Sequence, residues 1–413
     1  MRRVLFVHTN FPGQFLHLAR DLGRRDDWAV AAIGSATAKP MNGVTLERYE
    51  IEPTTRIEDP VAGRFVLDSR RGEAVVRAAV RLQTAGFTPD VVVGHTGWGE
   101  LLYLRDVFPS ARFVSYLEFY FSFEGADVNF DPEFPPAAPG SGADLPAIQA
   151  ALRARNAAVL LSATQSDVLV APTAWQASRF PADIRDRITI LHEGVDTKRL
   201  APHDGVRLEL PNGRFVQSGD EVLTYVARNL EPYRGFHRLM RALPDILKRR
   251  PEAQVLIIGG DDVSYGLPPA RRRTWKRALL DEVGDRLDLG RVHFLGRVPY
   301  DAYIGALQLS RVHVYLTYPF VLSWSMLEAM SCGAYLVASD TAPVSDVVRD
   351  GENGVLVGFF DQEALVEAVC RGLADVARAD PVRRAARDSI VSGYDLEAKC
   401  LPAALSLVNA SIT

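Results

Sequence analysis

The feature that most constrains the fold of this chain is an alternation of short apolar runs with stretches of helical period. In the first half, Gln14–Leu22 and Glu73–Gln83 carry the helical pattern. The apolar runs, each bounded by turn residues, are Arg3–Val7, Ala29–Ile33, Val44–Tyr49, Val91–Gly94, Phe113–Tyr116, Val168–Ala171 and Ile188–Leu191. Short apolar strands that alternate with helices predict a parallel sheet with helices on both of its faces.

The alternation begins again after a polar, glycine-containing stretch, Asp196–Gly219. The strands expected in this second half are Val222–Ala227, Gln254–Gly259, Val292–Leu295, Val312–Leu316, Tyr335–Ala338 and Val355–Val357. Helical patterns lie between them, at Phe236–Lys248, Ala270–Val283 and Ser325–Met330. The sequence therefore predicts an α/β protein with two Rossmann-like, doubly wound domains. Because such sheets bind ligands beyond the carboxyl ends of their strands, we expect the two domains to face each other across a cleft.

The expected domain boundaries follow from where each pattern stops. A chain of 413 residues suits two domains, at roughly 100–200 residues for each. We place the first domain at residues 1–195, a linker at 196–220 and the second domain at 221–390. The last segment, 391–413, is helical in pattern from Tyr394 to Ala410 and is expected to pack back on the first domain.

Composition excludes several classes of protein. A hydrophobic fraction of 47% and a charged fraction of 24% are ordinary for a globular chain. A net charge of −4 argues against a dedicated nucleic-acid binder. Cys332, Cys370 and Cys400 are too few and too far apart for a disulfide framework or a zinc knuckle. The first apolar run is too short for a signal peptide, and no run approaches ~18 apolar residues, so a cytoplasmic protein is expected.

The strongest chemical signal follows the strand Val222–Ala227. Arg228 and Arg234 flank a loop that leads into the next helix. Arginine presents a bidentate fork to phosphate oxygens, and a helix N-terminus adds backbone donors, so this loop suits a diphosphate. The alternative is a pair of ordinary surface arginines in an arginine-rich chain.

A second signal lies at Ser323–Gly333, after the strand Val312–Leu316. Ser323 or Ser325 can cap a helix whose N-terminus points at the expected ligand. Glu328 falls about one turn into that helix, where a carboxylate could accept hydrogen bonds from ribose hydroxyls. The alternative is a glutamate on a solvated helix face.

In the first half, Gly13 lies in a loop between a strand and a helix, where glycine lets the backbone approach a phosphate closely. No G-x-G-x-x-G occurs there, so a dinucleotide fingerprint is absent. His95 ends the strand Val91–Gly94 and is expected to point at the ligand. It could equally be a loop histidine that is bonded locally.

An acidic, aromatic segment, Leu117–Ala147, interrupts the alternation and contains no basic residue. Aromatic faces suit sugars and carboxylates suit hydroxyls, which makes Glu118, Tyr120 and Glu124 candidates for contact with an acceptor. The alternative is a lid or a surface excursion that never touches substrate. The helical stretch Arg70–Arg81 could contact anionic lipid headgroups, although such faces are more often only solvated.

Taken together, these motifs resemble glycosyltransferase family 4 over nearly the whole chain. Arg228–Gly235 resembles that family's diphosphate motif, with Arg234 where lysine is usual, and Leu327–Gly333 resembles its Leu-Glu-Ala-Met-x-x-Gly. Ile190–Asp196 is similar to its Asn-Gly-Val-Asp hinge, and Gly351–Gly354 to its Gly-x-x-Gly turn. A further segment, Val292–Gly296, is similar to its Phe-x-Gly motif, which implies that the backbone of Arg297 and Val298 faces the base.

One position departs from the family pattern. The family usually carries a second glutamate eight positions before the one that Glu328 matches, and Phe320 stands there. That glutamate normally contacts the transferred sugar, whereas an aromatic ring accepts no such hydrogen bond. A hydroxyl left unmet would cost ~1–3 kcal/mol, so either the sugar lacks that hydroxyl or another residue contacts it.

The resemblance implies a GT-B enzyme that transfers a sugar from a nucleoside diphosphate sugar to a glycan, lipid or small-molecule acceptor, with retention at the anomeric carbon. Catalysis would rest on positioning and on stabilising the leaving diphosphate by Arg228 and Arg234. Backbone donors at Gly13, Ser323 and Trp324 would supplement that charge.

Neither a cofactor nor a metal is expected. No Asp-x-Asp occurs in the sequence, although that pairing commonly holds a metal in the other major glycosyltransferase fold. The run Asp127–Asp131 hints at a calcium loop, but Pro132 and Ala138 occupy the positions of the required glycine and glutamate.

Two alternatives stay open. The chain could be a GT-B epimerase or hydrolase that needs no acceptor, or a nucleotide-binding protein with degraded catalysis. The expected partners are the nucleotide sugar and its acceptor, with no nucleic acid and at most peripheral contact with the inner membrane face.

Overall fold

The computed structural model describes residues 1–51, 59, 61–135, 144–269 and 273–410. The chain forms two compact units, Met1–Gly194 with Glu397–Thr413, and Val195–Leu396. Each unit is built on its own parallel sheet, so the predicted α/β class with two Rossmann-like domains is confirmed.

The first unit contains a seven-stranded sheet in the order β3-β2-β1-β4-β5-β6-β7, and every pair of neighbours is parallel. Its strands are β1 (Arg2–Val7), β2 (Trp28–Gly34), β3 (Val44–Arg48), β4 (Val91–His95), β5 (Arg112–Tyr116), β6 (Val168–Ala171) and β7 (Ile188–Ile190). Its helices are η1 (Gly13–Phe15), α1 (Leu16–Leu22), α2 (Gly63–Thr84), α3 (Leu104–Val107), α4 (Leu145–Thr164), α5 (Ala174–Ser178), α6 (Ala182–Arg185) and α14 (Leu401–Ala410).

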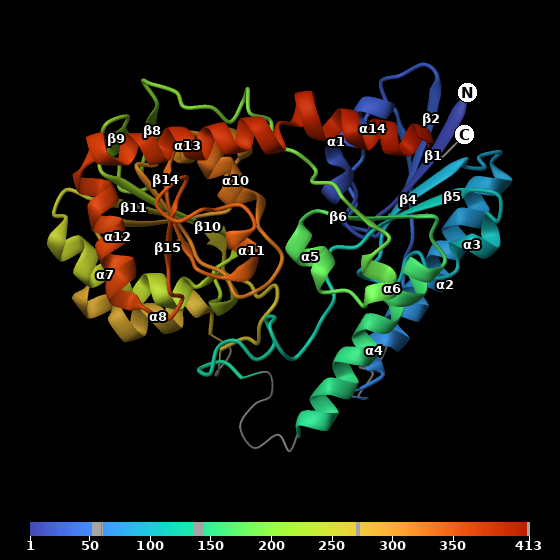
Figure 1. Cartoon of the computed structure of the whole chain (residues 1–413), viewed down its shortest axis with the longest axis horizontal. Helices are drawn as coiled ribbons and strands as arrows, with labels where there is room; N and C mark the ends of the chain where they lie inside the picture. The colour runs from blue at the N-terminus through green and yellow to red at the C-terminus, as the bar shows by residue number, and fades with distance from the viewer. Residues whose placement is uncertain (52–58, 60, 136–143, 270–272, 411–413) are drawn as a thin grey trace. The chain divides into compact units, whose positions relative to one another are not determined.

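Side chains that alternate along these strands enter two separate cores. Val4 and Phe6 of β1 face one layer, in which α1 and the chain's last helix, α14, cover the sheet (Figure 1). Leu5 and Val7 face the opposite layer, which α2 and α3 cover. The period of two along a strand therefore buries both faces of the central strands, as a parallel sheet requires.

The second unit contains a six-stranded parallel sheet in the order β12-β11-β10-β13-β14-β15. Its strands are β10 (Val222–Asn229), β11 (Gln254–Gly260), β12 (Val292–Gly296), β13 (Val312–Tyr315), β14 (Tyr335–Ser339) and β15 (Val355–Val357). Its helices are η2 (Pro232–Arg234), α7 (Phe236–Arg249), α8 (Trp275–Val283), η4 (Gly284–Arg286), α9 (Tyr300–Leu309), α10 (Trp324–Ser331), α11 (Ala342–Ser345), α12 (Gln362–Ala374) and α13 (Val376–Tyr394).

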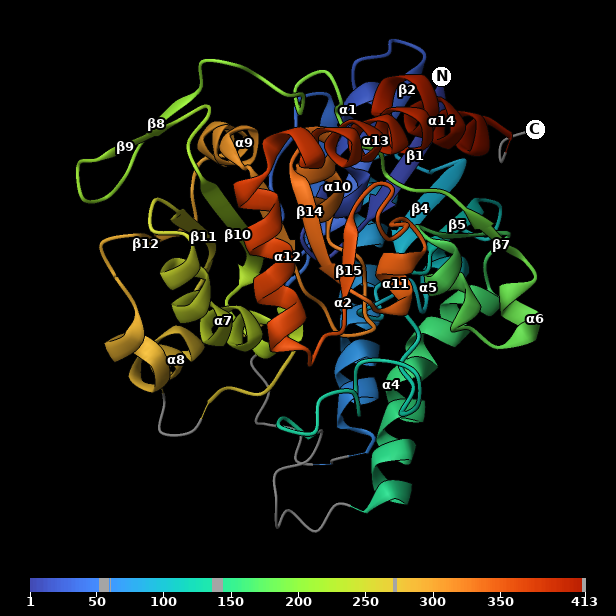
Figure 2. The ribbon, with the colours of Figure 1, turned by 60° about the vertical axis from the view of Figure 1, so that its left-hand side comes forward.

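The helices of the second unit also form two layers. α9, α10 and α13 share one core with the sheet residues Leu256 and Leu336. α7 and α12 lie side by side, and α12 also packs on β13 and β14 (Figure 2). Each sheet is thus covered on both faces, and the strand ends are left for ligands.

Two segments differ in detail from their expected form. Residues 196–220 belong to the second unit and carry an antiparallel ribbon of β8 (Arg207–Glu209) and β9 (Phe215–Gln217). The helical pattern expected at Tyr394–Ala410 consists of a π-helical turn, Leu396–Cys400 (η5), followed by α14. Among the helices of the described residues, none combines the length and the apolarity that crossing a membrane demands.

Each sheet reverses its strand order next to its first strand. β1 lies between β2 and β4 in the first unit, and β10 lies between β11 and β13 in the second. The helices that follow two such neighbouring strands lie on opposite faces, so the loops after the strands diverge and leave a crevice at the carboxyl edge. The loops after β1 and β4, and those after β10 and β13, are therefore where chemistry should collect.

Gly235 controls how closely the two loops of the second unit approach each other. Its φ is +66°, and a Cβ there would lie 2.3 Å from the Cβ of Leu316. We expect Gly235→Ala to lower the free energy of unfolding by about 3 kcal/mol, because the residue would be strained and would also force the loop after β13 to move. Urea denaturation followed by circular dichroism measures the loss.

Gly284→Ala is the matched control for this substitution. Gly284 has φ −63° and ψ −31°, and open space surrounds its missing Cβ. Its replacement should change the free energy of unfolding by less than ~0.5 kcal/mol, or stabilise the unit slightly. If both substitutions changed the free energy of unfolding equally, the conformation and close packing of Gly235 would not be required for stability.

Candidate functional site

Arg234, the last residue of η2, lies where the loops that follow β10 and β13 meet. Its side chain is 6% exposed, and its Nη1 donates to the hydroxyl of Tyr315 at 3.0 Å and to that of Thr317 at 2.9 Å. The guanidinium also lies 5.5 Å from the ring centroid of Tyr265 and 5.7 Å from that of Phe320. Among the residues that the structure describes, no carboxylate forms an ion pair with it.

This environment leaves a buried positive charge that hydroxyls and aromatic faces solvate but no carboxylate neutralises. Isolated buried charges are unfavourable, so natural proteins pair them or use them to bind ions. An anion at Arg234 would gain charge-assisted hydrogen bonds in a site from which most water is already excluded.

Arg228 has a different environment. It lies near the end of β10 and is exposed, and no described residue forms a hydrogen bond or ion pair with it. Of the two arginines that flank this loop, Arg234 is therefore buried and Arg228 is exposed to solvent.

A residue that the sequence analysis did not identify, Glu231, holds this loop in place. Its buried carboxylate accepts hydrogen bonds from the backbone N–H groups of Ser264, Tyr265 and Gly266, at 3.1, 3.2 and 3.0 Å. Because Tyr265 packs on Arg234, Glu231 fixes one wall of the site through backbone that is 33 or more residues away. A glutamate between the two arginines was the only signal that the sequence offered, and its partners could not be predicted from the sequence.

The N-terminus of α10 reaches the same crevice. Ser323 is the N-cap residue, but its hydroxyl pairs with that of Ser325 at 3.0 Å and makes no capping hydrogen bond. Its backbone N–H donates instead to the Tyr315 hydroxyl at 2.8 Å. Tyr315 thus connects Ser323 to Arg234, and the neighbouring Trp324 is 42% exposed.

Glu328, further along α10, is already hydrogen-bonded. Its carboxylate accepts from the hydroxyl of Tyr303, which is buried, and from that of Tyr300, which is 3.2 Å away and 46% exposed. Burial raises the pKa of Glu328, and the two tyrosine hydrogen bonds act in the opposite direction. Both tyrosines come from α9, and nothing in the sequence indicated that they meet Glu328.

Arg297 and Val298 follow β12 and differ in environment. The Arg297 side chain donates to Asn229 at 3.1 Å and pairs with Asp262 at 3.0 Å, while Val298 packs against the core of the unit. Arg297 thereby connects the ends of three neighbouring strands, β10, β11 and β12.

Phe320 belongs to an aromatic cluster. Its ring meets Tyr265 edge to face at 4.9 Å and Tyr233 at 5.7 Å, and Tyr233 packs on Tyr318 at 4.7 Å. The ring is buried, so this position supports Arg234 and offers no acceptor to a sugar hydroxyl.

In the first unit, the loops after β1 and β4 form a network around Glu118. His8 and Gln14 are hydrogen-bonded at 2.7 Å, and Gln14 Nε2 donates to Glu118 Oε1 at 2.6 Å. The other Glu118 oxygen lies 3.4 Å from Nε2 of His95. His8 follows β1 as His95 ends β4, so the adjacency of these strands brings the two imidazoles to 5.3 Å.

The backbone assigns the tautomers of both imidazoles. Asn10 N–H donates to His8 Nδ1 at 2.9 Å, and Gly97 N–H donates to His95 Nδ1 at 3.0 Å. In the neutral form of either ring, the proton therefore lies on Nε2. This nitrogen faces Gln14 in His8 and Glu118 in His95. His95 is 1% exposed and stacks on Trp98 at 4.3 Å.

The surroundings of His8 and Glu118 change the pKa of each side chain. Burial, reinforced by His95, lowers the pKa of His8 to about 3, so His8 is neutral at physiological pH. Burial alone would raise the pKa of Glu118, but its interactions with His95, His8 and Gln14 outweigh burial and lower it. Glu118 is therefore an anionic acceptor, and the Gln14 amide donates to it.

The remaining sequence candidates are less close to this network. Gly13 has φ +46°, and a Cβ there would lie 2.4 Å from the His8 ring, so the glycine lets the loop close over His8. Tyr120 packs on Phe180 at 5.5 Å. Glu124 is exposed, and its backbone carbonyl accepts hydrogen bonds from Arg179 and Ser122. Of the three acceptor-side candidates, the structure brings only Glu118 to His95.

Two family models match the chain. The model of the Glycosyl transferase family 4 group matches residues 26–200, and that of the Glycosyl transferases group 1 matches residues 208–389. Together the matches cover most of both units, and the chain belongs to the family 4, group 1 glycosyltransferases.

Curated relatives match part of the chain. It is 28% identical over 238 residues to a D-inositol 3-phosphate glycosyltransferase of Acidothermus cellulolyticus, covering 56% of this chain and 51% of that protein. It is 26% identical over 226 residues to a GDP-mannose-dependent alpha-(1-6)-phosphatidylinositol monomannoside mannosyltransferase of Mycolicibacterium smegmatis, covering 52% and 55%. The matched region thus spans about half the length of these relatives.

Solved structures match the whole chain at low sequence identity. A sucrose-phosphate synthase of Thermosynechococcus elongatus has a TM-score of 0.72 and 18% identity and covers 99% of each chain. The Anabaena HepE protein in complex with UDP has a TM-score of 0.67 and 14% identity and covers 99% of this chain and 100% of that one. These likenesses confirm the predicted GT-B fold.

Because the pKa of His8 is lowered, the free energy of unfolding should depend on pH. Between pH 6.5 and about 3 the unfolded chain binds a proton at His8 that the folded chain does not, so stability falls as pH falls through this window. At pH 5 the loss from this group should reach about 2 kcal/mol. Glu118 adds a loss of the same sign only at lower pH.

Hydrogen exchange of the β1 amides at pH 7 and pH 5, corrected for intrinsic rates, measures this loss. His8→Gln should remove about 2 kcal/mol of the pH dependence, whereas the matched substitution at the exposed His203 should leave it intact. An unchanged pH dependence in His8→Gln would mean that His8 is protonated in the folded state.

Proposed function

We propose that this chain is a glycosyltransferase that transfers a sugar from a nucleoside diphosphate sugar to an acceptor hydroxyl, with retention at the anomeric carbon and without a metal. Its membership in the family supports the class of reaction. The observation that carries the proposal is Arg234, a buried cation without a carboxylate partner among the described residues, at the crevice where parallel sheets bind phosphates.

In this proposal the second unit binds the donor. Arg234 and Arg228 hold the diphosphate, and the backbone at Ser323 and Trp324 adds donors from the N-terminus of α10. As the glycosidic bond breaks, negative charge grows on the diphosphate, so these groups stabilise the transition state more than the ground state.

Glu328 is proposed to bind the ribose. Its hydrogen bond from Tyr303 is buried, whereas the one from Tyr300 is longer and half-exposed, so a ribose hydroxyl can replace Tyr300 while Tyr303 keeps the carboxylate oriented. The backbone of Arg297 and Val298 is proposed to contact the base.

The donor sugar is constrained by Phe320. Because the ring offers no acceptor, the proposed sugar either lacks a hydroxyl at that position or is contacted there by another residue. In the first unit, Glu118 and His95 are proposed to orient the acceptor hydroxyl, and the departing diphosphate takes its proton. Gly13, Tyr120 and Glu124 are proposed to line the path of the substrates.

Binding of UDP and GDP, measured by calorimetry, tests the donor site. Arg234→Ala should raise the Kd about 100-fold, because a charge-assisted hydrogen bond is worth about 3 kcal/mol. Arg234→Lys keeps the positive charge but loses the bidentate guanidinium. Its Kd should lie between that of the wild type and that of Arg234→Ala. Arg241→Ala, which removes a surface pair with Glu282, is the control and should bind as the wild type does. Normal binding by Arg234→Ala would refute the donor site.

Turnover of nucleotide sugars, followed by release of the diphosphate, separates the transferase from its alternatives. Release that depends on an acceptor, that persists in EDTA and that gives a product of the donor's anomeric configuration supports the proposal. Release without an acceptor indicates a hydrolase, interconversion of the donor an epimerase, and binding without turnover a protein with degraded catalysis. A loss of activity in EDTA that metal restores would overturn metal independence.

A further inference from the structure

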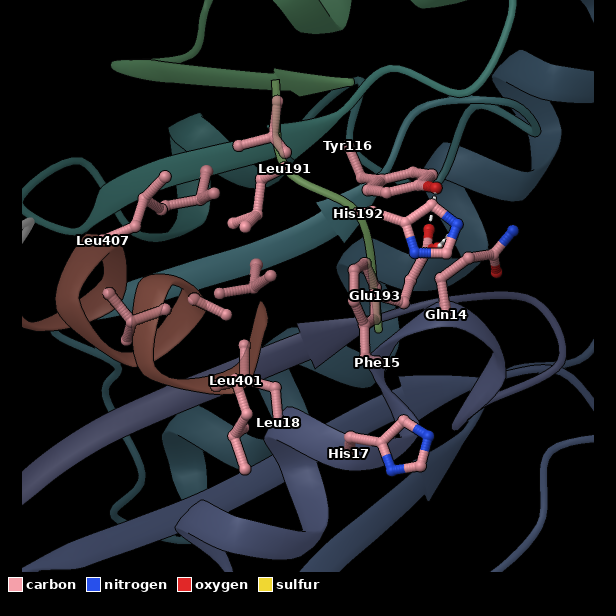
Figure 3. Close-up of a pocket in the computed structure, with 15 residues that line it drawn as sticks. Gln14, Phe15, His17, Leu18, Tyr116, Leu191, His192, Glu193, Leu401 and Leu407 are labelled. Atoms are coloured by element: carbon pink, nitrogen blue, oxygen red, sulfur yellow. Dashed lines mark hydrogen bonds and ion pairs between the residues drawn. The ribbon is translucent and has the colours of Figure 1, made fainter. Parts of the chain in front are cut away.

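The first unit contains a pocket that the donor and acceptor groups above do not use. It lies between α14, α1 and one face of the sheet and opens to solvent (Figure 3). Its walls are mainly aliphatic and aromatic side chains, among them Leu18 of α1, Val93 and Val114 of the sheet, and Leu401 and Leu407 of α14.

Polar groups gather at one end of this pocket. Figure 3 shows Gln14, Tyr116, His192 and Glu193 together, whereas Leu401 and Leu407 lie away from them. The Tyr116 hydroxyl donates to the Glu193 carboxylate, and His192 Nε2 lies 3.5 Å from the same carboxylate. A further polar residue, His17, lies on α1 apart from this group.

The polar end of the pocket adjoins the acceptor-side network. Gln14 belongs to both, because it lines the pocket and donates to Glu118 at 2.6 Å. The Tyr116 ring lies 5.4 Å from the His95 ring. A molecule whose head sits between Gln14 and Tyr116 is therefore one residue away from Glu118 and His95.

Small side chains on α14 leave this space open. Ala404 faces the pocket with the smallest apolar side chain, and Val408 is the one described residue of α14 that is buried. Protein interiors have few voids larger than a water molecule. An apolar pocket with a few polar groups at one end has the character of a ligand site.

We propose that this pocket holds the alkyl chain of an amphiphilic acceptor, with its hydroxylated head at the end formed by Gln14, Tyr116 and Glu193. An alkyl chain fits walls that offer almost no polar partner, and a hydroxyl head fits carboxylate and amide acceptors. The role of this ligand as acceptor rests on the proposed function, whereas its binding to the pocket does not.

Calorimetry with n-butyl, n-hexyl and n-octyl β-glucoside, each below its micelle concentration and without donor, tests the binding. Each added methylene should tighten the Kd about fourfold, because burying one contributes about 0.8 kcal/mol. Glucose itself should not bind measurably. A Kd that does not change with chain length overturns the proposal.

Two substitutions on the same helix locate the site. Ala404→Phe places a ring in the pocket and should abolish the dependence on chain length, whereas Ala403→Phe, on the exposed side of α14, should preserve it. If Ala404→Phe fails to fold, Ala404→Leu replaces it and should weaken octyl glucoside binding at least tenfold. If the Kd of Ala404→Phe still depends on the length of the alkyl chain, the alkyl chain does not bind in this pocket.

The same probes separate this inference from the proposed function. Ala404→Phe and Ala403→Phe should both bind UDP and GDP as the wild type does. If alkyl glucosides bind as expected but no acceptor of any length accelerates diphosphate release, the pocket stands and the transferase assignment fails. If short acceptors turn over and lengthening the chain leaves kcat/KM unchanged, the transferase stands and the alkyl site fails.

Discussion

Both units depend on one constraint, the divergence of the two loops that follow neighbouring parallel strands when their helices cover opposite faces of a sheet. In the first unit the strands are β1 and β4, and in the second they are β10 and β13. No helix can cover the carboxyl ends at that point, so backbone donors and polar side chains meet there without a competing core. Gly235 shows how tight this arrangement is, because a single added Cβ would collide with the loop across the crevice.

The electrostatics of the second unit follow from that geometry. Arg234 reaches the crevice from a short 3₁₀ turn and is surrounded by hydroxyls and rings, which lower the penalty of burial without neutralising the charge. Glu231, only three residues earlier, is kept from pairing with it because three backbone N–H groups occupy its carboxylate. The chain thus buries two oppositely charged side chains close together in sequence. The carboxylate of Glu231 is bound by backbone N–H groups, whereas the guanidinium of Arg234 contacts hydroxyls and aromatic rings.

In the first unit, a chain of hydrogen-bonded side chains holds the Glu118 carboxylate. Burial keeps His8 neutral, and His8 orients Gln14, which in turn holds Glu118. Gln14 also borders the apolar pocket under α14, so one amide joins the polar network to the apolar space. An acceptor with both a hydroxylated and an apolar part would contact each side of this residue.

The sequence by itself determined the strands of both sheets, their parallel class and the family, because period, turn residues and motifs are local properties. It did not indicate that Tyr300 and Tyr303 bind Glu328, that Glu231 holds the loop at Tyr265, or that His8 acts through Gln14 on Glu118. It also did not indicate the pocket beneath α14. These features join side chains that are tens to hundreds of residues apart, so only the packing of the elements in three dimensions could decide them.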